Sequence, residues 1–89
     1  MVQKMCPVDV IAVYSASGEI RPLRVQMEDD TRQLMRVNIE QIVKVTQIEH
    51  VGAEATVFLC RATVWEQKWL FELKYSIRSH IWTMVGQLH

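Results

Sequence analysis

Two runs in which apolar and polar residues alternate, at 58–65 and 69–75, constrain the fold of this chain more than any other feature. The apolar positions are Phe58, Cys60, Ala62 and Val64 in the first run, and Trp69, Phe71, Leu73 and Tyr75 in the second. Side chains on a strand point to opposite faces in turn, so each run predicts a strand with one apolar face. We expect the second set to line the main core.

A two-residue turn at Glu66-Gln67 would join the two runs as a hairpin. In that register Ala62 lies opposite Phe71 on one face, and Arg61 lies opposite Glu72 on the other. A slip of one residue would set apolar against polar side chains throughout, so the pattern supports this pairing. Glu-Gln lacks the Asn-Gly or Asp-Gly chemistry that tight hairpins favour, which leaves a looser loop as the alternative.

The remainder of the chain also shows strand patterns, at 8–14, 20–27, 34–39, 43–48 and 81–85. Pairing Val25 with Val37, and Met27 with Met35, keeps the apolar rows of the second and third strands together. The alternation stops at 39–43, which predicts a bend or bulge there, with a short helical turn as the alternative. One helix over 34–48 is the competing interpretation, although the β-branched residues at 43–48 favour a strand.

Six or seven short strands, with turn signals about every ten residues, predict an all-β fold. We expect a small antiparallel meander closed into a barrel or roll, because closure removes exposed edges, and a tight sandwich stays open as an alternative. The predicted organisation is an N-terminal lead-in at 1–7, a single β domain at 8–85 and a C-terminal tail at 86–89.

Composition limits the classes of function. Ten basic residues balance ten acidic residues, so the formal charge is zero. This argues against a protein that binds nucleic acid through a strong overall field, while a local basic patch stays possible. The two cysteines lie far apart and no apolar run is long enough to cross a bilayer, which favours a cytoplasmic protein with free thiols and no membrane association.

No motif in the sequence predicts a catalytic, cofactor-binding or metal-binding site. The three glycines are isolated, so there is no phosphate-binding loop. The three histidines lie at or near predicted loops and termini, without a metal-ligand spacing, and are expected to be solvated.

Two candidate surfaces remain. Arg24 and Arg36 fall on the outward faces of the paired strands, with Arg21 nearby, and arginines on a sheet face can hold phosphates or carboxylates, or simply keep that face soluble. Leu59, Trp65 and Leu70 fall on the polar face of the 58–75 hairpin, where apolar residues can mark a contact site unless another strand covers them.

The segment Ile20-Arg21-Pro22-Leu23-Arg24-Val25 is followed by an acidic turn, a cysteine-bearing strand and the late aromatic Trp82. Over residues 20–84 this pattern resembles a group of short uncharacterised all-β bacterial proteins with an early Arg-Pro-x-Arg strand. Some proteins of similar pattern accompany DNA-repair polymerases. The resemblance implies the fold and an association with nucleic acid, and it implies no enzymatic activity.

The sequence therefore favours a cytoplasmic, non-enzymatic protein-interaction domain that can self-associate, with a homodimer formed through the outward face that carries Leu70. A weak nucleic-acid-binding barrel that uses the three arginines is the alternative. A small enzyme, with a site not recognisable from sequence, is the third hypothesis.

Overall fold

The computed structural model describes residues 5–28 and 31–88, which form seven strands and no helix. The strands are β1 (Met5–Tyr14), β2 (Ile20–Glu28), β3 (Leu34–Asn38), β4 (Gln41–Ile48), β5 (Ala55–Val64), β6 (Gln67–Ser76) and β7 (Trp82–Leu88). They belong to one sheet in the order β3-β2-β1-β7-β6-β5-β4, and every neighbouring pair is antiparallel. The prediction of an all-β antiparallel fold is confirmed.

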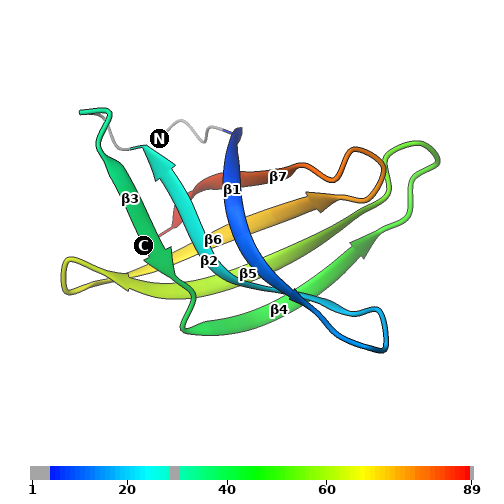
Figure 1. Cartoon of the computed structure of the whole chain (residues 1–89), viewed down its shortest axis with the longest axis horizontal. Coiled ribbons are helices and arrows are strands. Elements are labelled where there is room, and N and C mark those ends of the chain that lie inside the picture. The colour runs from blue at the N-terminus through cyan, green and yellow to red at the C-terminus, as the bar shows by residue number, and fades with distance from the viewer. Residues whose placement is uncertain (1–4, 29–30, 89) are drawn as a thin grey trace.

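The sheet is curled, so that β1, β2 and β3 lie across β5 and β6 and β3 approaches β5 (Figure 1). β3 and β4 follow each other in the chain but occupy opposite ends of the sheet. The two residues between them bond to both halves: the Ile39 amide donates to the Leu23 carbonyl at 2.9 Å, and the Glu40 amide donates to the Arg61 carbonyl at 2.9 Å. The predicted bend is confirmed, and the alternative helix over 34–48 is wrong.

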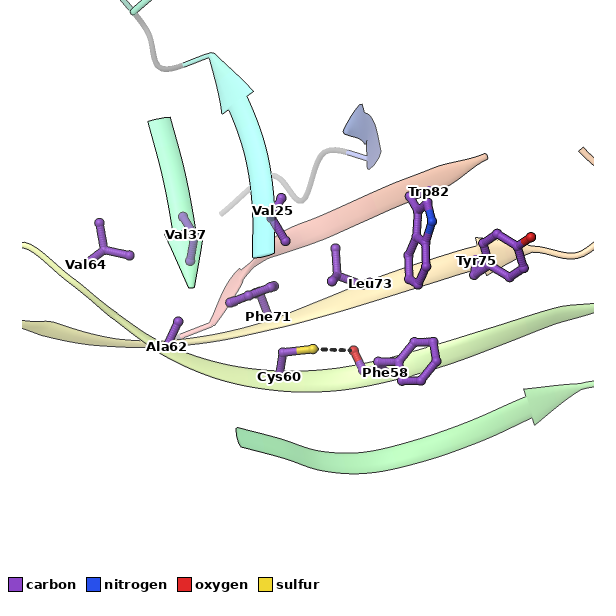
Figure 2. Close-up of a cluster of buried hydrophobic side chains, with 10 residues drawn as sticks. All are labelled: Val25, Val37, Phe58, Cys60, Ala62, Val64, Phe71, Leu73, Tyr75 and Trp82. Carbon is purple, nitrogen blue, oxygen red and sulfur yellow. Dashed lines mark hydrogen bonds between the residues drawn. The ribbon is translucent and has the colours of Figure 1, made fainter. Parts of the chain in front are cut away.

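The core fills the inside of this curled sheet. Figure 2 shows side chains from β2, β3, β5, β6 and β7 pointing toward one another. The buried cluster consists of Val25, Val37, Phe58, Cys60, Ala62, Val64, Phe71, Leu73, Tyr75 and Trp82. The Trp82 ring lies 4.8 Å from the Tyr75 ring and 5.8 Å from the Phe58 ring, measured between centroids. Of the four residues predicted to line the core, Phe71, Leu73 and Tyr75 are buried, and Trp69 is partly buried against the cluster.

The register of the β5–β6 hairpin differs from the predicted one by two residues. Phe71 lies opposite Cys60 rather than Ala62, and Arg61 lies opposite Leu70 rather than Glu72. The turn consists of Trp65 and Glu66, with φ of 49° and 64°, because Val64 pairs with Gln67. Positive φ at both central positions is the backbone of the tight hairpin turn whose twist matches that of the strands. A shift of two residues leaves every side chain on its predicted face, so the apolar pattern does not distinguish the two registers.

The first and last strands extend beyond their predicted bounds. β1 begins at Met5, within the predicted lead-in, because Met5–Val8 pair with the segment from Val85 back to Trp82. β7 continues to Leu88, within the predicted tail, because its end pairs with Leu70 and Phe71 of β6. Residues 5–7 of the predicted lead-in and 86–88 of the predicted tail are therefore parts of the sheet, while residues 1–4 and His89 lie outside the described residues.

The β2–β3 pairing has the predicted register, with Val25 opposite Val37 and Met27 opposite Met35. Pro22 pairs with Ala12 where the β1–β2 register shifts, and pairing of β2 with β3 begins only at Arg24. Proline cannot donate to a ladder, and a bulge is one of the places where a sheet tolerates it.

Candidate interaction surfaces

Leu59 and Leu70 are brought together on the outer face of the sheet, the face that points away from the core. Leu59 lies opposite Glu72 and Leu70 lies opposite Arg61, so the two leucines are diagonal neighbours on adjacent strands. Both are half-buried. Among the described residues β6 contacts only β5 and β7, so no other strand covers this face.

Polar side chains border the two leucines toward one end of the hairpin. Arg61 Nη1 donates to Gln41 Oε1 at 3.1 Å, and the Thr63 hydroxyl donates to Glu40 Oε1 at 2.9 Å. Lys68 Nζ lies 3.7 Å from the same Glu40 oxygen, with both side chains well exposed. An apolar centre with a polar border is the composition of a small contact surface.

Trp65, the third residue of the predicted surface, lies at the tip of the β5–β6 hairpin. It is one of the two turn residues, and 75 % of its surface is exposed. Its position in the turn separates it from the strand faces that carry Leu59 and Leu70. The structure therefore brings together two of the three predicted residues and places the third at the end of the hairpin.

The outer edge of β4 is a feature that the sequence analysis did not single out. β4 is the last strand of the sheet and, among the described residues, contacts only β5. Val43 and Val45 are 42 % and 50 % exposed along this edge. An unpaired edge presents a row of free backbone N–H and C=O groups that another strand can bond. The β-branched residues Val43, Val45 and Thr46 were visible in the sequence, but their place at an edge depends on the order of all seven strands.

A cleft of about 550 Å³ adjoins β4 at one end of the curled sheet. Its walls come from the β1–β2 hairpin on one side and from β4, β5 and β6 on the other. Thr56 and Gln47 face each other in it, with the Thr56 hydroxyl donating to Gln47 Oε1 at 3.0 Å. Two further lining residues, Tyr14 and Ile77, are exposed and apolar, so this end of the sheet combines an open edge with an apolar recess.

The three predicted arginines share the outer face of β1, β2 and β3. Arg21 lies opposite Val13, Arg24 lies opposite Ile11 and Asn38, and Arg36 lies opposite Gln26. All three arginines are exposed.

The surroundings of these arginines are mixed in charge. Arg24 Nε donates to Asn38 Oδ1 at 2.8 Å, and within residues 5–28 and 31–88 neither Arg21 nor Arg36 forms an ion pair. Asp9, opposite Gln26, and Glu28, opposite Leu34, place two carboxylates on the same face. The exposed apolar neighbours, Ile11 and Val13, are aliphatic and offer no ring on which a base could stack.

Two core residues, Cys60 and Tyr75, have shifted pKa values, and Tyr75 also lines the cleft beside β4. Burial raises the pKa of the Cys60 thiol to about 12. Burial also raises the pKa of Tyr75, and the neighbouring Tyr14 side chain adds to that effect. The Tyr75 hydroxyl is 2.7 Å from Nδ1 of His80, an exposed residue that the sequence analysis treated as solvated. A thiol with a raised pKa is a poor nucleophile, so Cys60 has the chemistry of a core residue.

Among the described residues, no three His, Cys, Asp or Glu side chains come close enough together to hold a metal ion. The same part of the chain contains no helix that is long and apolar enough to cross a membrane. No protein-family model matches this chain, and comparisons with curated proteins and with solved structures give no significant match.

Proposed function

We propose that this chain is a non-enzymatic protein-interaction domain that binds a strand of its partner along the outer edge of β4. The observation that carries the proposal is the open edge itself: β4 ends the sheet and, in the described part of the chain, no segment pairs with its outer side. Strand addition at such an edge is a recurring mode of peptide recognition, in which backbone hydrogen bonds supply affinity and neighbouring recesses supply specificity.

The composition of β4 supports this role. Prolines, charged side chains and bulges discourage an edge strand from pairing with another chain. β4 has neither a proline nor a carboxylate, Lys44 is its single charged residue, and its bulge lies near one end, between Ile42 and Lys44. Its exposed valines would be covered by an added strand, which removes apolar surface from water.

The surroundings of β4 support it as well. Lys44 lies opposite Leu59, so the outer-face leucines begin one strand away from the edge. A partner could extend over this face after pairing with β4. The zero formal charge leaves little long-range repulsion between this chain and a partner.

We propose no catalytic role for this chain, because burial keeps the Cys60 thiol protonated and a protonated thiol is a poor nucleophile. We also propose a cytoplasmic location. Cys6 and Cys60 are free, and Cys6 is exposed, which suits a reducing compartment.

The proposal is tested by placing a photoactivatable phenylalanine analogue at Val45 in cells that make the protein. Irradiation should give a covalent protein adduct from position 45. The matched control is the same analogue at Val51, which is 99 % exposed in a loop. Adduct formation at 45 that does not exceed that at 51 would contradict the proposal. A third arm at Leu70 tests the predicted outer face, and adducts at 70 alone would move the interface there.

Nucleic-acid binding by the arginine face is the second candidate function. The observation in its favour is that Arg21, Arg24 and Arg36 are exposed on one face. Single-stranded DNA should then bind with an affinity that falls steeply as salt rises, and Arg24→Gln with Arg36→Gln should weaken binding. Arg61→Gln, on the outer face of β5, is the matched control. Binding that is absent at low salt, or equally weakened by the control, would exclude this function.

A further inference from the structure

We propose that the partner at the β4 edge is a second copy of this chain, and that two β4 strands pair antiparallel about a twofold axis passing between the two Thr46 residues. The inference rests on the proposed function, and it adds the identity of the partner and the register of the pairing. Symmetric pairs of this kind are the commonest form of homo-oligomer.

Symmetry restricts the registers that two β4 strands can adopt. A twofold axis perpendicular to the sheet makes the strands antiparallel and keeps each side chain on its own face. Residues that lie opposite each other in an antiparallel pair must share a face. The residue on the axis therefore lies opposite the same residue of the partner. Registers that place a residue opposite the partner's copy of the next residue in the chain are excluded.

The bulge in β4 selects among the registers that remain. The register with β5 shifts between Ile42 and Lys44, and it is regular only from Lys44 to Ile48. An axis at Thr46, the middle of this segment, pairs all five residues, from Lys44 to Ile48, with their symmetry partners. An axis at Val45 or Gln47 pairs three residues of the regular segment, so fewer backbone groups are bonded.

Charge supports the same register. An axis at Lys44 would set two ammonium groups directly opposite each other, which is destabilising. With the axis at Thr46, Lys44 lies opposite the partner's Ile48, where the aliphatic stem of the lysine can cover the isoleucine. Thr46 then lies opposite the partner's Thr46 on the outer face, and cross-strand threonine pairs are favourable.

The pairing covers exposed apolar surface of Val45 on the inner face. Val45, half of whose surface is exposed, lies opposite the partner's Gln47 beside the cleft of about 550 Å³. Pairing of β4 with β4 also gives a closed dimer, because the twofold axis uses the same edge of both copies. Pairing of β4 with the other end strand, β3, would be a head-to-tail contact, which leads to rings or filaments rather than to a closed pair.

A cysteine scan tests the register. Cys6 is exposed and is first replaced in a Cys6→Ser background, whereas Cys60 is buried with its pKa raised to about 12 and can stay. Thr46→Cys places two thiols on directly opposite residues, with Cβ atoms about 5 Å apart. Lys44→Cys places them four residues apart along the strands, or about 13 Å, beyond the reach of a disulfide.

Under mild oxidation Thr46→Cys should form a covalent dimer at least about tenfold faster than Lys44→Cys, which is the matched control for thiol exposure on the same strand face. Sedimentation of the parent at micromolar concentrations should show a dimer. Circular dichroism checks that each variant has the parent's β spectrum.

Each failure has a distinct meaning. A parent that sediments as a monomer, or a Thr46→Cys variant that oxidises no faster than Lys44→Cys, overturns the self-pairing. An adduct from position 45 whose mass is not twice that of the chain also overturns it, and leaves the interaction function in place with another partner. The absence of any adduct at position 45 removes both.

Discussion

Cys60 lies directly opposite Phe71 in the β5–β6 ladder, and both side chains are almost completely buried. Cys60 Sγ is 3.5 Å from the Phe58 carbonyl oxygen, which can accept the thiol hydrogen, as the dashed line in Figure 2 shows. Both residues belong to the buried apolar cluster drawn in Figure 2. Changes at either residue should therefore act on the stability of the whole sheet.

Phe71→Ala should remove a large part of the free energy of unfolding. Truncating a buried phenylalanine costs about 3–5 kcal/mol, whereas domains of ordinary stability have only about 5–15 kcal/mol. Urea unfolding followed by tryptophan fluorescence measures the loss. The control is Val51→Ala at a position that is 99 % exposed, which should change stability little. A Phe71→Ala variant that melts within a few degrees of the parent would place Phe71 outside the core.

The two thiols should differ in reactivity. Cys6 is exposed and should react with a thiol reagent at neutral pH, whereas Cys60 should react only after unfolding in denaturant. The raised pKa of Cys60 means that the folded state favours the neutral thiol. Its contribution to stability is therefore complete below pH 9 and should be lost as the pH rises from 9 toward 12. The slope of stability against pH in this range should be smaller in Cys60→Ala; an unchanged slope would assign the alkaline loss to other groups.

The turn between β5 and β6 should gain stability from residues that tolerate positive φ. Trp65 and Glu66 both have φ in the left-handed region, which costs about 1–2 kcal/mol for a residue with a side chain. Replacing the pair with Asn-Gly should therefore raise the melting temperature by several degrees. Val51→Gly, at a loop residue without positive φ, is the control and should bring no gain. A melting temperature that falls in the Asn-Gly variant would show that Trp65 makes a stabilising contact.

The hydrogen bond between Tyr75 and His80 should be measurable as a coupling energy. The hydroxyl and Nδ1 are 2.7 Å apart, and a hydrogen bond of this kind contributes about 0.5–1.5 kcal/mol. A double-mutant cycle with Tyr75→Phe and His80→Ala isolates it, and cancels the effect of the positive φ of His80, which is 58°. Coupling near zero would mean that the two side chains do not bond in solution.

Local patterns predicted which residues face the core, because the alternation of side chains depends only on neighbouring residues. Phe71 and Leu73 were assigned to the correct face in a hairpin whose register was wrong by two residues. Apolar periodicity excludes register shifts of an odd number of residues but not shifts of an even number. The exact register depended on a turn at Trp65 and Glu66 that lacks the usual turn residues.

The candidate surfaces were predictable to different degrees. The outward positions of Arg24, Arg36, Leu59 and Leu70 follow from the same alternation. The open edge of β4 does not, since it exists only because β1 pairs with β7 and leaves β4 at the end of the sheet. Pairings between distant segments are decided by the packing of the whole core, and no short stretch of sequence records them.

The pairing of β1 with β7 has a consequence for how the chain folds. β4, β5, β6 and β7 pair with their neighbours in sequence, and so do β1, β2 and β3, but the two sets are joined in the sheet through strands near opposite ends of the described chain. Closing so long a loop costs entropy before any contact compensates for it, and such long-range pairing slows folding. During synthesis, the set of β1, β2 and β3 can join the rest of the sheet only after β7 has left the ribosome. A circular permutant that links β7 to β1 and begins at Gln41 would turn every pairing into one between successive strands, and should fold faster than the parent.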